Sequence, residues 1–332
     1  MKDDPRTAEF RPPERLGELL GELNELLAGC QAAVNRRYAK PRYPLLLIMG
    51  APHSGTTLFL QWLAESRLWG YPTNVISRFF AAPYIGARVQ QVLIENDYRE
   101  QVSDFKHTQP YASTLGYTEG ALAPNEFWYF WRRFFPFSPE ADVVPPEALA
   151  RVDVTRLNTE LAALEAALQK PLAMKGMLLN WHIPFLNAAF EKVLFVNLRR
   201  EPAYVVQSVL AARRKYFGTE EPWYSFKPPE YRWLKEKSPV AQVAGQVYFI
   251  RQATDEGCAQ VAERRKLVLD YETFCENPAA TWETLRGKMA EQGYLLPGDY
   301  AGPRHFDAAN QVRTSPQRWF QIQQALVEMQ RR

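Results

Sequence analysis

A short loop rich in glycine and hydroxyl side chains is the first feature of the sequence that suggests chemistry. The segment "LLLIMGAPHSGTT", residues 45–57, places Gly50 and Gly55 at the spacing of a phosphate-binding loop. Backbone N–H groups of such a loop, together with the N-terminus of the following helix, bind a phosphate group. A nucleoside triphosphatase would continue with Lys after the second glycine, but Thr56 and Thr57 follow here. The loop therefore predicts an anion site without the lysine that reaches the β- and γ-phosphates of ATP.

A second anion-binding pattern lies further along the chain. In "RREPAYVVQS", Arg200 follows an apolar run, and Ser208 lies in a helix that Pro202 is expected to open. An arginine at a strand end and a hydroxyl on the next helix are suited to a second phosphate. The apolar run, residues 192–198, is not followed by the Asp with which many ATPases hold magnesium. The ligand is therefore predicted to carry anions at two separate places.

These two segments, with a third, resemble the sulfotransferases that use 3′-phosphoadenosine 5′-phosphosulfate (PAPS). Residues 52–57 read Pro-His-Ser-Gly-Thr-Thr, where the family has Pro-Arg/Lys-Ser-Gly-Thr-Thr. The family's 3′-phosphate motif has an Arg, a Pro two positions later and a Ser eight positions later, which Arg200, Pro202 and Ser208 match. The segment "YETFCENP", which begins at Tyr271, is similar to a third family element. The three elements occur in the family's order over most of the chain.

The resemblance implies a donor site and assigns residues to it. PAPS would be the co-substrate and 3′,5′-PAP the product, with no metal required. PAPS has no γ-phosphate, which accounts for a loop without the lysine. Arg313 and Arg318, late in the chain, are further candidates for the 3′-phosphate, with solvated positions as the alternative. The residues that the resemblance assigns to the donor are His53, Ser54, Gly55, Thr56, Thr57, Arg200, Ser208 and Tyr271.

One position departs from the family pattern. His53 stands where the family has Arg or Lys close to the 5′-phosphosulfate. A protonated histidine would replace that cation, and an adjacent dianion should raise its pKa in that direction. The alternative is a neutral histidine that only donates or accepts a hydrogen bond, in a slower enzyme or an inactive relative.

Sulfuryl transfer to a hydroxyl also needs a group that takes the acceptor's proton. Glu126 is preferred, because it is expected to begin an aromatic-rich helix where water is scarce; alternatively, it offsets that helix's dipole. Glu119 is the second choice. The resemblance places Lys175 near the transferred group, with an ordinary surface lysine as the alternative. His107 and His182 are weaker candidates, a loop residue and a structural residue respectively.

The elements that must position these residues alternate between apolar runs and helical patterns. Alternation of this kind, with the resemblance, predicts an α/β, P-loop-like three-layer fold: a central parallel sheet flanked by helices, with ligands at the carboxyl ends of its strands. The strands are expected at residues 45–49, 172–175, 192–198 and 266–271. The main helices are expected near residues 14–38, 56–65, 83–97, 145–169, 202–214, 239–264, 278–292 and 315–331.

The chain is expected to form an N-terminal helical extension, residues 1–40, and a single domain, residues 41–332. Two irregular segments near residues 98–137 and 215–237 are rich in aromatic residues and are predicted to form loops over the acceptor site. Within them, Trp223, Tyr224 and Tyr231 are candidates for a lid. The dense aromatic run at residues 127–135 must bury at least one face in the core, which leaves two or three rings for the acceptor.

Bulk composition narrows the function classes. Hydrophobic residues make up 46% and charged residues 23% of the 332 residues, as in soluble globular proteins, and a net charge of +3 does not favour nucleic acid as a partner. Three scattered cysteines indicate neither a disulfide scaffold nor a zinc site. No long apolar stretch predicts membrane insertion, so a cytoplasmic location is expected.

The favoured function is transfer of a sulfuryl group from PAPS to a hydroxyl of a small-molecule or glycan acceptor. Resemblance to the bacterial and Golgi-type branch of the family favours a carbohydrate or glycolipid. Two alternatives stay open: a P-loop kinase or other phosphotransferase that would need ATP and magnesium, and a non-catalytic relative that binds PAP without turnover. The sequence leaves the oligomeric state open.

Overall fold

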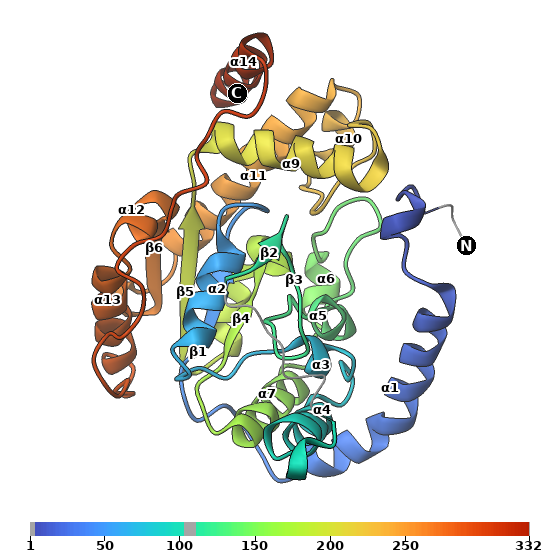
Figure 1. Ribbon diagram of the computed structural model, residues 1–332, viewed down its shortest axis with the longest axis vertical. Helices are drawn as coiled ribbons and strands as arrows, with labels where there is room; N and C mark the ends of the chain where they lie inside the picture. Colours follow the sequence, from blue (N-terminus) through green and yellow to red (C-terminus); the bar gives the residue numbers. More distant parts are fainter. Residues whose placement is uncertain (1–3, 103–110, 332) are drawn as a thin grey trace.

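The computed structural model describes residues 4–102 and 111–331 and is built around a four-stranded parallel sheet (Figure 1). The strand order is β4-β1-β5-β6. The strands are β1 (Leu45–Met49), β4 (Ala173–Lys175), β5 (Val193–Arg199) and β6 (Lys266–Asp270). All four lie within one or two residues of the predicted strands, and the α/β class is confirmed.

The two faces of β1 enter different apolar clusters, which explains its uninterrupted apolar sequence. Side chains alternate across a strand, so Leu45 and Leu47 point to one face of the sheet, and Leu46 and Ile48 point to the other. All five residues of β1 are buried. Parallel strands covered on both faces are selected for apolar residues at every position.

Helices cover both faces of the sheet and complete three layers (Figure 1). Residues of α2 (Thr56–Glu65), α12 (Tyr271–Glu276) and α13 (Pro278–Ala290) pack on the Leu46 face. The opposite face is covered by α5 (Trp128–Phe134), α7 (Val154–Leu168), α9 (Pro202–Phe217), α11 (Pro239–Ala259) and α14 (Pro316–Gln330).

Several helix boundaries differ from the prediction. The expected helix at residues 83–97 is α4 (Pro83–Gln90) followed by a π-helical turn over Gln91–Glu95. The expected helix at residues 145–169 is two helices, α6 (Pro146–Leu149) and α7, because the Asp153 side chain accepts a hydrogen bond from the backbone N–H of Arg156 and starts a new helix. The remaining helices are α3 (Asn74–Ser77), α8 (Ile183–Ala189) and α10 (Tyr231–Leu234).

A small hairpin that was not predicted lies over the phosphate loop. It pairs β2 (Ser113–Thr114) with β3 (Tyr117–Thr118). The two residues of its turn, Leu115 and Gly116, have φ of 50° and 92°, the positive values that a tight hairpin turn of this length favours. A Cβ atom at Gly116 would lie 3.8 Å from Thr57 Oγ1, so the turn reaches the first turn of α2, directly after the phosphate loop.

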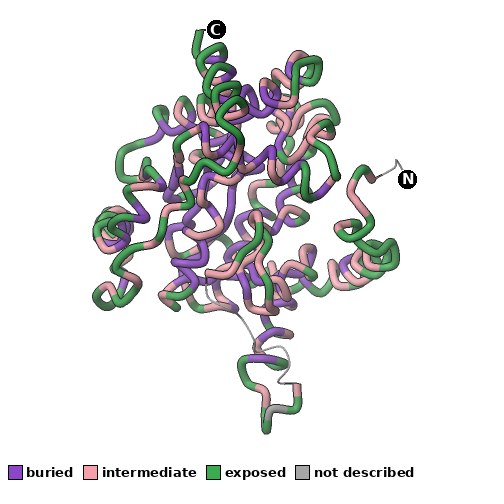
Figure 2. The backbone as a smooth tube through the Cα atoms, turned by 45° about the horizontal axis from the view of Figure 1, so that its top comes forward, coloured by how far each residue is buried: buried purple, intermediate pink, exposed green. Residues whose placement is uncertain are grey.

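The predicted N-terminal extension forms α1 (Glu14–Asn35), a largely exposed helix (Figure 2). Its buried residues are polar. Asn24 donates to the carbonyl of Arg78 at 2.8 Å and accepts from the N–H of Ala81 at 2.7 Å, and Gln31 accepts from the N–H of Tyr84 at 3.1 Å. Across residues 4–102 and 111–331, the helices are too short or too polar to cross a bilayer.

Candidate functional site

Two glycines let the loop between β1 and α2 fold against its neighbours. Gly50 has φ of 134°, and a Cβ there would lie 2.5 Å from the carbonyl oxygen of Leu198. Gly55 has φ of 94°, and a Cβ there would lie 2.3 Å from the ring of Tyr271. Both positions exclude a side chain by conformation and by close approach. The loop therefore packs directly on Tyr271, a residue from the third sequence element.

Asn180 holds the start of this loop and was missed by sequence reasoning. Its side chain accepts a hydrogen bond from the N–H of Gly50 at 3.1 Å and donates one to the carbonyl of Gly50 at 2.9 Å. Asn180 is fully buried, in the turn that follows β4. A polar residue within the apolar stretch "MLLNWHI" was the available signal. Within the loop, the Ser54 hydroxyl donates to the carbonyl of Ala51 at 2.8 Å.

His53 links the two predicted phosphate motifs. Its Nδ1 lies 2.7 Å from the Ser208 hydroxyl, and its buried Nε2 has no hydrogen-bond partner among the described residues. Burial lowers the His53 pKa to about 4, and the charges of Arg200 and Lys175 add to this shift. Desolvation and the two neighbouring cations favour the neutral ring, so the predicted charged imidazole depends on the dianion of a bound donor.

Arg200 lies beside the loop, and its guanidinium donates to no carboxylate in the described part of the chain, although the charge of Glu272 acts on it. Its guanidinium donates to the carbonyl of His53 at 2.9 Å, to Asn310 Oδ1 at 2.8 Å and to the carbonyl of Ala309 at 2.6 Å. It also lies over the Tyr271 ring, 5.0 Å from the centroid. Neutral acceptors orient the group while its positive charge stays available for an anion.

Lys175 joins the loop to the preferred proton acceptor. Its Nζ donates to Thr57 Oγ1 and to Glu126 Oε1, both at 2.7 Å. The Lys175 side chain is 3% exposed and that of Glu126 is 34% exposed. Lys175 is therefore a buried ammonium rather than the surface lysine of the alternative prediction. Glu126 differs from expectation too: it precedes α5, which begins at Trp128, and faces solvent in part.

These groups line one large cleft of about 1370 Å³. The loop, Arg200 and Ser208 form one part of its wall, and Lys175 and Glu126 form another. Both irregular segments contribute residues to the cleft, through Trp128 and Tyr129 of α5 and through Trp223 and Tyr224. The aromatic residues that instead belong to the buried core are Phe130, Trp131, Phe134 and Phe135.

Other sequence candidates lie elsewhere. Glu119 is exposed and does not line the cleft. His182 is structural: its Nε2 accepts from the N–H of Val144 at 2.9 Å, and burial lowers its pKa to about 4. Arg313 lines the cleft, whereas Arg318 forms an ion pair with Glu220. His107 lies outside the described residues, and Tyr231 packs against Trp223 without lining the cleft.

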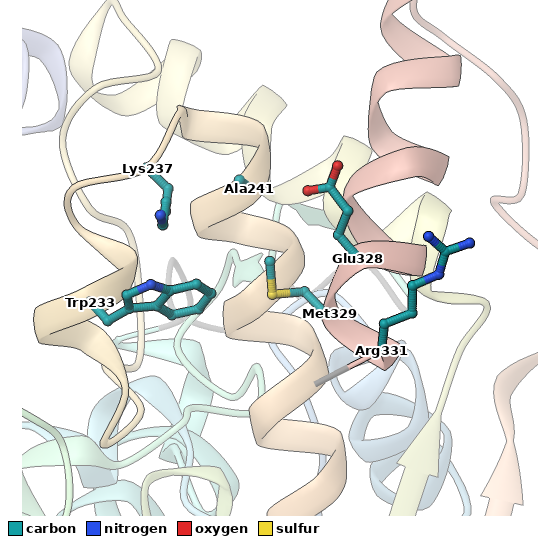
Figure 3. A pocket seen from close by; sticks show the side chains of 6 residues that line it. All are labelled: Trp233, Lys237, Ala241, Glu328, Met329 and Arg331. Atoms are coloured by element: carbon teal, nitrogen blue, oxygen red, sulfur yellow. The ribbon is translucent and has the colours of Figure 1, made fainter.

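A smaller cavity of about 300 Å³ lies between α10, α11 and α14 (Figure 3). Trp233, Lys237, Glu328 and Met329 are among its lining residues, and none of the predicted site residues reaches it. Within residues 4–102 and 111–331, no group of three His, Cys, Asp or Glu side chains is arranged to hold a metal ion. The predicted residues His53, Lys175 and Arg200 line the large cleft instead.

Comparisons with known proteins identify the fold and the family. The fold is similar to crystal structures of sulfotransferase STF9 from Mycobacterium avium (TM-score 0.52, 12% identity, covering 98% of this chain and 79% of that chain) and of sulfotransferase STF1 from Mycobacterium tuberculosis H37Rv (TM-score 0.51, 13% identity, 92% and 75%). No curated protein gave a significant sequence match. The model of the sulfotransferase family matches residues 44–288. That match spans well over half of the chain, and the chain therefore belongs to the sulfotransferase family, as its motifs predicted.

Proposed function

We propose that the protein transfers the sulfuryl group of PAPS to a hydroxyl group and releases PAP. The observation that carries the proposal is the convergence of both phosphate motifs and a Lys–Glu pair on one cleft. His53 Nδ1, from the loop, lies 2.7 Å from Ser208, and Lys175 Nζ lies 2.7 Å from both Thr57 and Glu126. The cleft thus combines anion sites with a carboxylate that can take a proton.

The donor would bind with its two anionic ends on the two motifs. The loop and the N-terminus of α2 are suited to the 5′-phosphosulfate, because backbone N–H groups at a helix N-terminus favour an anion. Arg200 and Ser208 are suited to the 3′-phosphate. The Arg200 guanidinium donates to neutral acceptors among the described residues, so it can form a direct ion pair with a phosphate.

Glu126 and Lys175 would divide the chemistry of transfer. Glu126 takes the proton of the acceptor hydroxyl as the oxygen forms its bond to sulfur, and the bond between sulfur and the bridging phosphate oxygen breaks. Negative charge then grows on the leaving phosphate. The Lys175 ammonium, which donates to Thr57 in the first turn of α2, would stabilise that charge.

We infer a carbohydrate or glycolipid acceptor. A cleft of about 1370 Å³ exceeds the roughly 300–1,000 Å³ that houses one drug-sized ligand, so it can hold the donor and an acceptor together. Trp128, Tyr129 and Trp223 offer ring faces in the wall, beside Glu126. Aromatic faces pack well against the apolar face of a sugar ring.

Calorimetric titration tests the donor site without knowledge of the acceptor. We expect PAP to bind tightly, 5′-AMP to bind at least tenfold more weakly, and Arg200→Ala to remove the difference, because the 3′-phosphate would lose its charged partner. Arg37→Ala, an exposed arginine outside the cleft, is the control. Equal binding of PAP and AMP, or preferential binding of ATP with magnesium, would contradict the proposal.

The neutral His53 keeps one alternative in view. A ring without charge gives less stabilisation to the leaving phosphate than the family's Arg or Lys. If the protein binds PAP tightly but fails to transfer radiolabelled sulfuryl from PAPS to simple sugars, alkyl glycosides and phenols alike, a non-catalytic PAP-binding role is the better account.

A further inference from the structure

The N-terminal segment forms a wall of the cleft that holds Glu126 and Lys175. Residues from Arg6 to Leu20 line this cleft together with the catalytic candidates. Figure 1 shows α1 along one side of the molecule, apart from the helices that cover the sheet. The N-terminal extension is thus part of the site rather than an appendage to it.

Two anchors hold this wall in place. At one end, the N–H of Thr7 donates to the carbonyl of Tyr216 at 2.9 Å, and the ring of Phe10 packs edge-on against the Tyr216 ring at a centroid distance of 4.9 Å. At the other end, Asn24 bonds to the backbone at Arg78 and Ala81. Fixed at both ends, residues 10–20 form a defined surface opposite the body of the protein.

From Pro12 to Leu20 the cleft-facing side of this wall is apolar, whereas Arg6, Glu9 and Arg11 line the cleft nearer the N-terminus. Leu16 and Leu20 lie four residues apart, and therefore on one face of α1, and both line the cleft. They are half-buried and belong to neither apolar core cluster. Leu19, on another face, is 46% exposed and does not line the cleft. The body contributes Trp128 and Phe226, which pack edge-to-face at 5.5 Å, to the same cleft.

We propose that this wall binds the apolar portion of an amphipathic acceptor, whose hydroxyl-bearing head lies at Glu126. The proposal rests on the sulfotransferase function above and narrows the acceptor to an alcohol or sugar attached to an alkyl chain or other apolar group. The occupant is the acceptor because the apolar wall and the Lys175–Glu126 pair line one continuous cleft. A purely polar glycan would leave the two leucines and Phe10 in contact with water.

Alkyl glucosides of increasing chain length test the proposal by binding alone. Hexyl, octyl and decyl β-D-glucoside, each below its micelle-forming concentration, are titrated into the full-length protein with and without saturating PAP, and glucose is the polar comparison. Burial of each methylene is worth about 0.8 kcal/mol, so affinity should rise about two- to fourfold per added methylene. In Leu16→Asp and Leu20→Asp this dependence should vanish, and in Leu20→Ala it should weaken.

Leu19→Asp is the matched control, because it places the same charge on the same turn of α1 outside the cleft. It should keep the wild-type dependence on chain length. Affinity that is independent of chain length, or an equal loss in Leu19→Asp and Leu20→Asp, overturns the proposal. PAP affinity is measured for every variant: a protein that binds alkyl glucosides as expected but not PAP would refute the donor assignment and leave the apolar subsite standing.

Discussion

Replacing Glu126 by glutamine separates its two proposed roles, proton acceptor and ion-pair partner of Lys175. The glutamine carbonyl can still accept the hydrogen bond that Lys175 Nζ now donates at 2.7 Å, but it cannot take a proton from the acceptor hydroxyl. General base catalysis contributes about 10²–10⁴-fold to rate. We therefore expect kcat to fall about 100-fold or more, while the affinity for PAP changes little.

The same substitution has a stability cost that the exposure of the pair bounds. Breaking a fully buried ion pair costs about 3–5 kcal/mol, whereas an exposed pair contributes about 0–1 kcal/mol. Lys175 is 3% exposed, but Glu126 is 34% exposed, so water reaches one side of the pair. Because glutamine also keeps a hydrogen bond, we expect the free energy of unfolding to fall by about 1–2 kcal/mol.

Three measurements on one variant distinguish the roles: transfer of radiolabelled sulfuryl from PAPS to a responsive acceptor, calorimetry with PAP, and urea unfolding. Glu119→Gln is the comparison, because Glu119 is the other carboxylate that the sequence suggested and it lies outside the cleft wall. A Glu126→Gln enzyme that turns over at the wild-type rate refutes the assignment of the base. If PAP affinity falls in step with kcat, the defect lies in the donor site instead.

Three further predictions concern the scaffold of the site. Burial lowers the His182 pKa from 6.5 to about 4, so the unfolded chain binds a proton at a higher pH than the folded protein does. Lowering the pH from 7 to 5 should therefore reduce the free energy of unfolding by about 2 kcal/mol through this group. In urea unfolding, His182→Gln should remove that part of the pH dependence. Gly55→Ala should lower the free energy of unfolding by about 2 kcal/mol or more and weaken PAP binding at least tenfold, because the new Cβ would lie 2.3 Å from Tyr271. The control is Gly293→Ala, where φ is 81° but the space around the Cβ is open, so only the smaller conformational cost is expected. Similar losses of stability in both variants would disprove the steric argument. Asn180→Ala should lower the free energy of unfolding by about 1–3 kcal/mol and weaken PAP binding, because Gly50 loses both hydrogen bonds to the Asn180 side chain. Unchanged PAP affinity would show that the loop keeps its shape without Asn180.

The two central strands, β1 and β5, were predictable because they are buried on both faces. Burial of that kind selects a continuous apolar run, which is visible at residues 45–49 and 193–196 without any tertiary information. Helix ends were less predictable. The break between α6 and α7 depends on one capping aspartate, and the hairpin at residues 113–118 is too short to show a strand pattern.

The residues of the proposed donor site could be selected from the sequence to the extent that they are contiguous. The backbone geometry of a loop requires particular residues at particular spacings. Gly50 and Gly55, with the hydroxyl residues Ser54, Thr56 and Thr57, therefore form a recognisable pattern. Arg200 and Ser208 were identified for the same reason. Each motif lies at a junction of a strand and a helix, where the chain must turn in a fixed way.

Only the tertiary structure decided which distant side chains meet. Lys175 and Glu126 are 49 residues apart, Asn180 and Gly50 are 130 apart, and no periodicity connects either pair. The lowered pKa of His53 likewise follows from burial beside Arg200 and Lys175, which its neighbours in the chain do not reveal. Local patterns encode the central strands, the glycine-containing loop and the family, so these could be read from the sequence. The pairing of Glu126 with Lys175 and the apolar part of the α1 wall depend on packing between segments far apart in the chain, where one residue type is compatible with many surroundings.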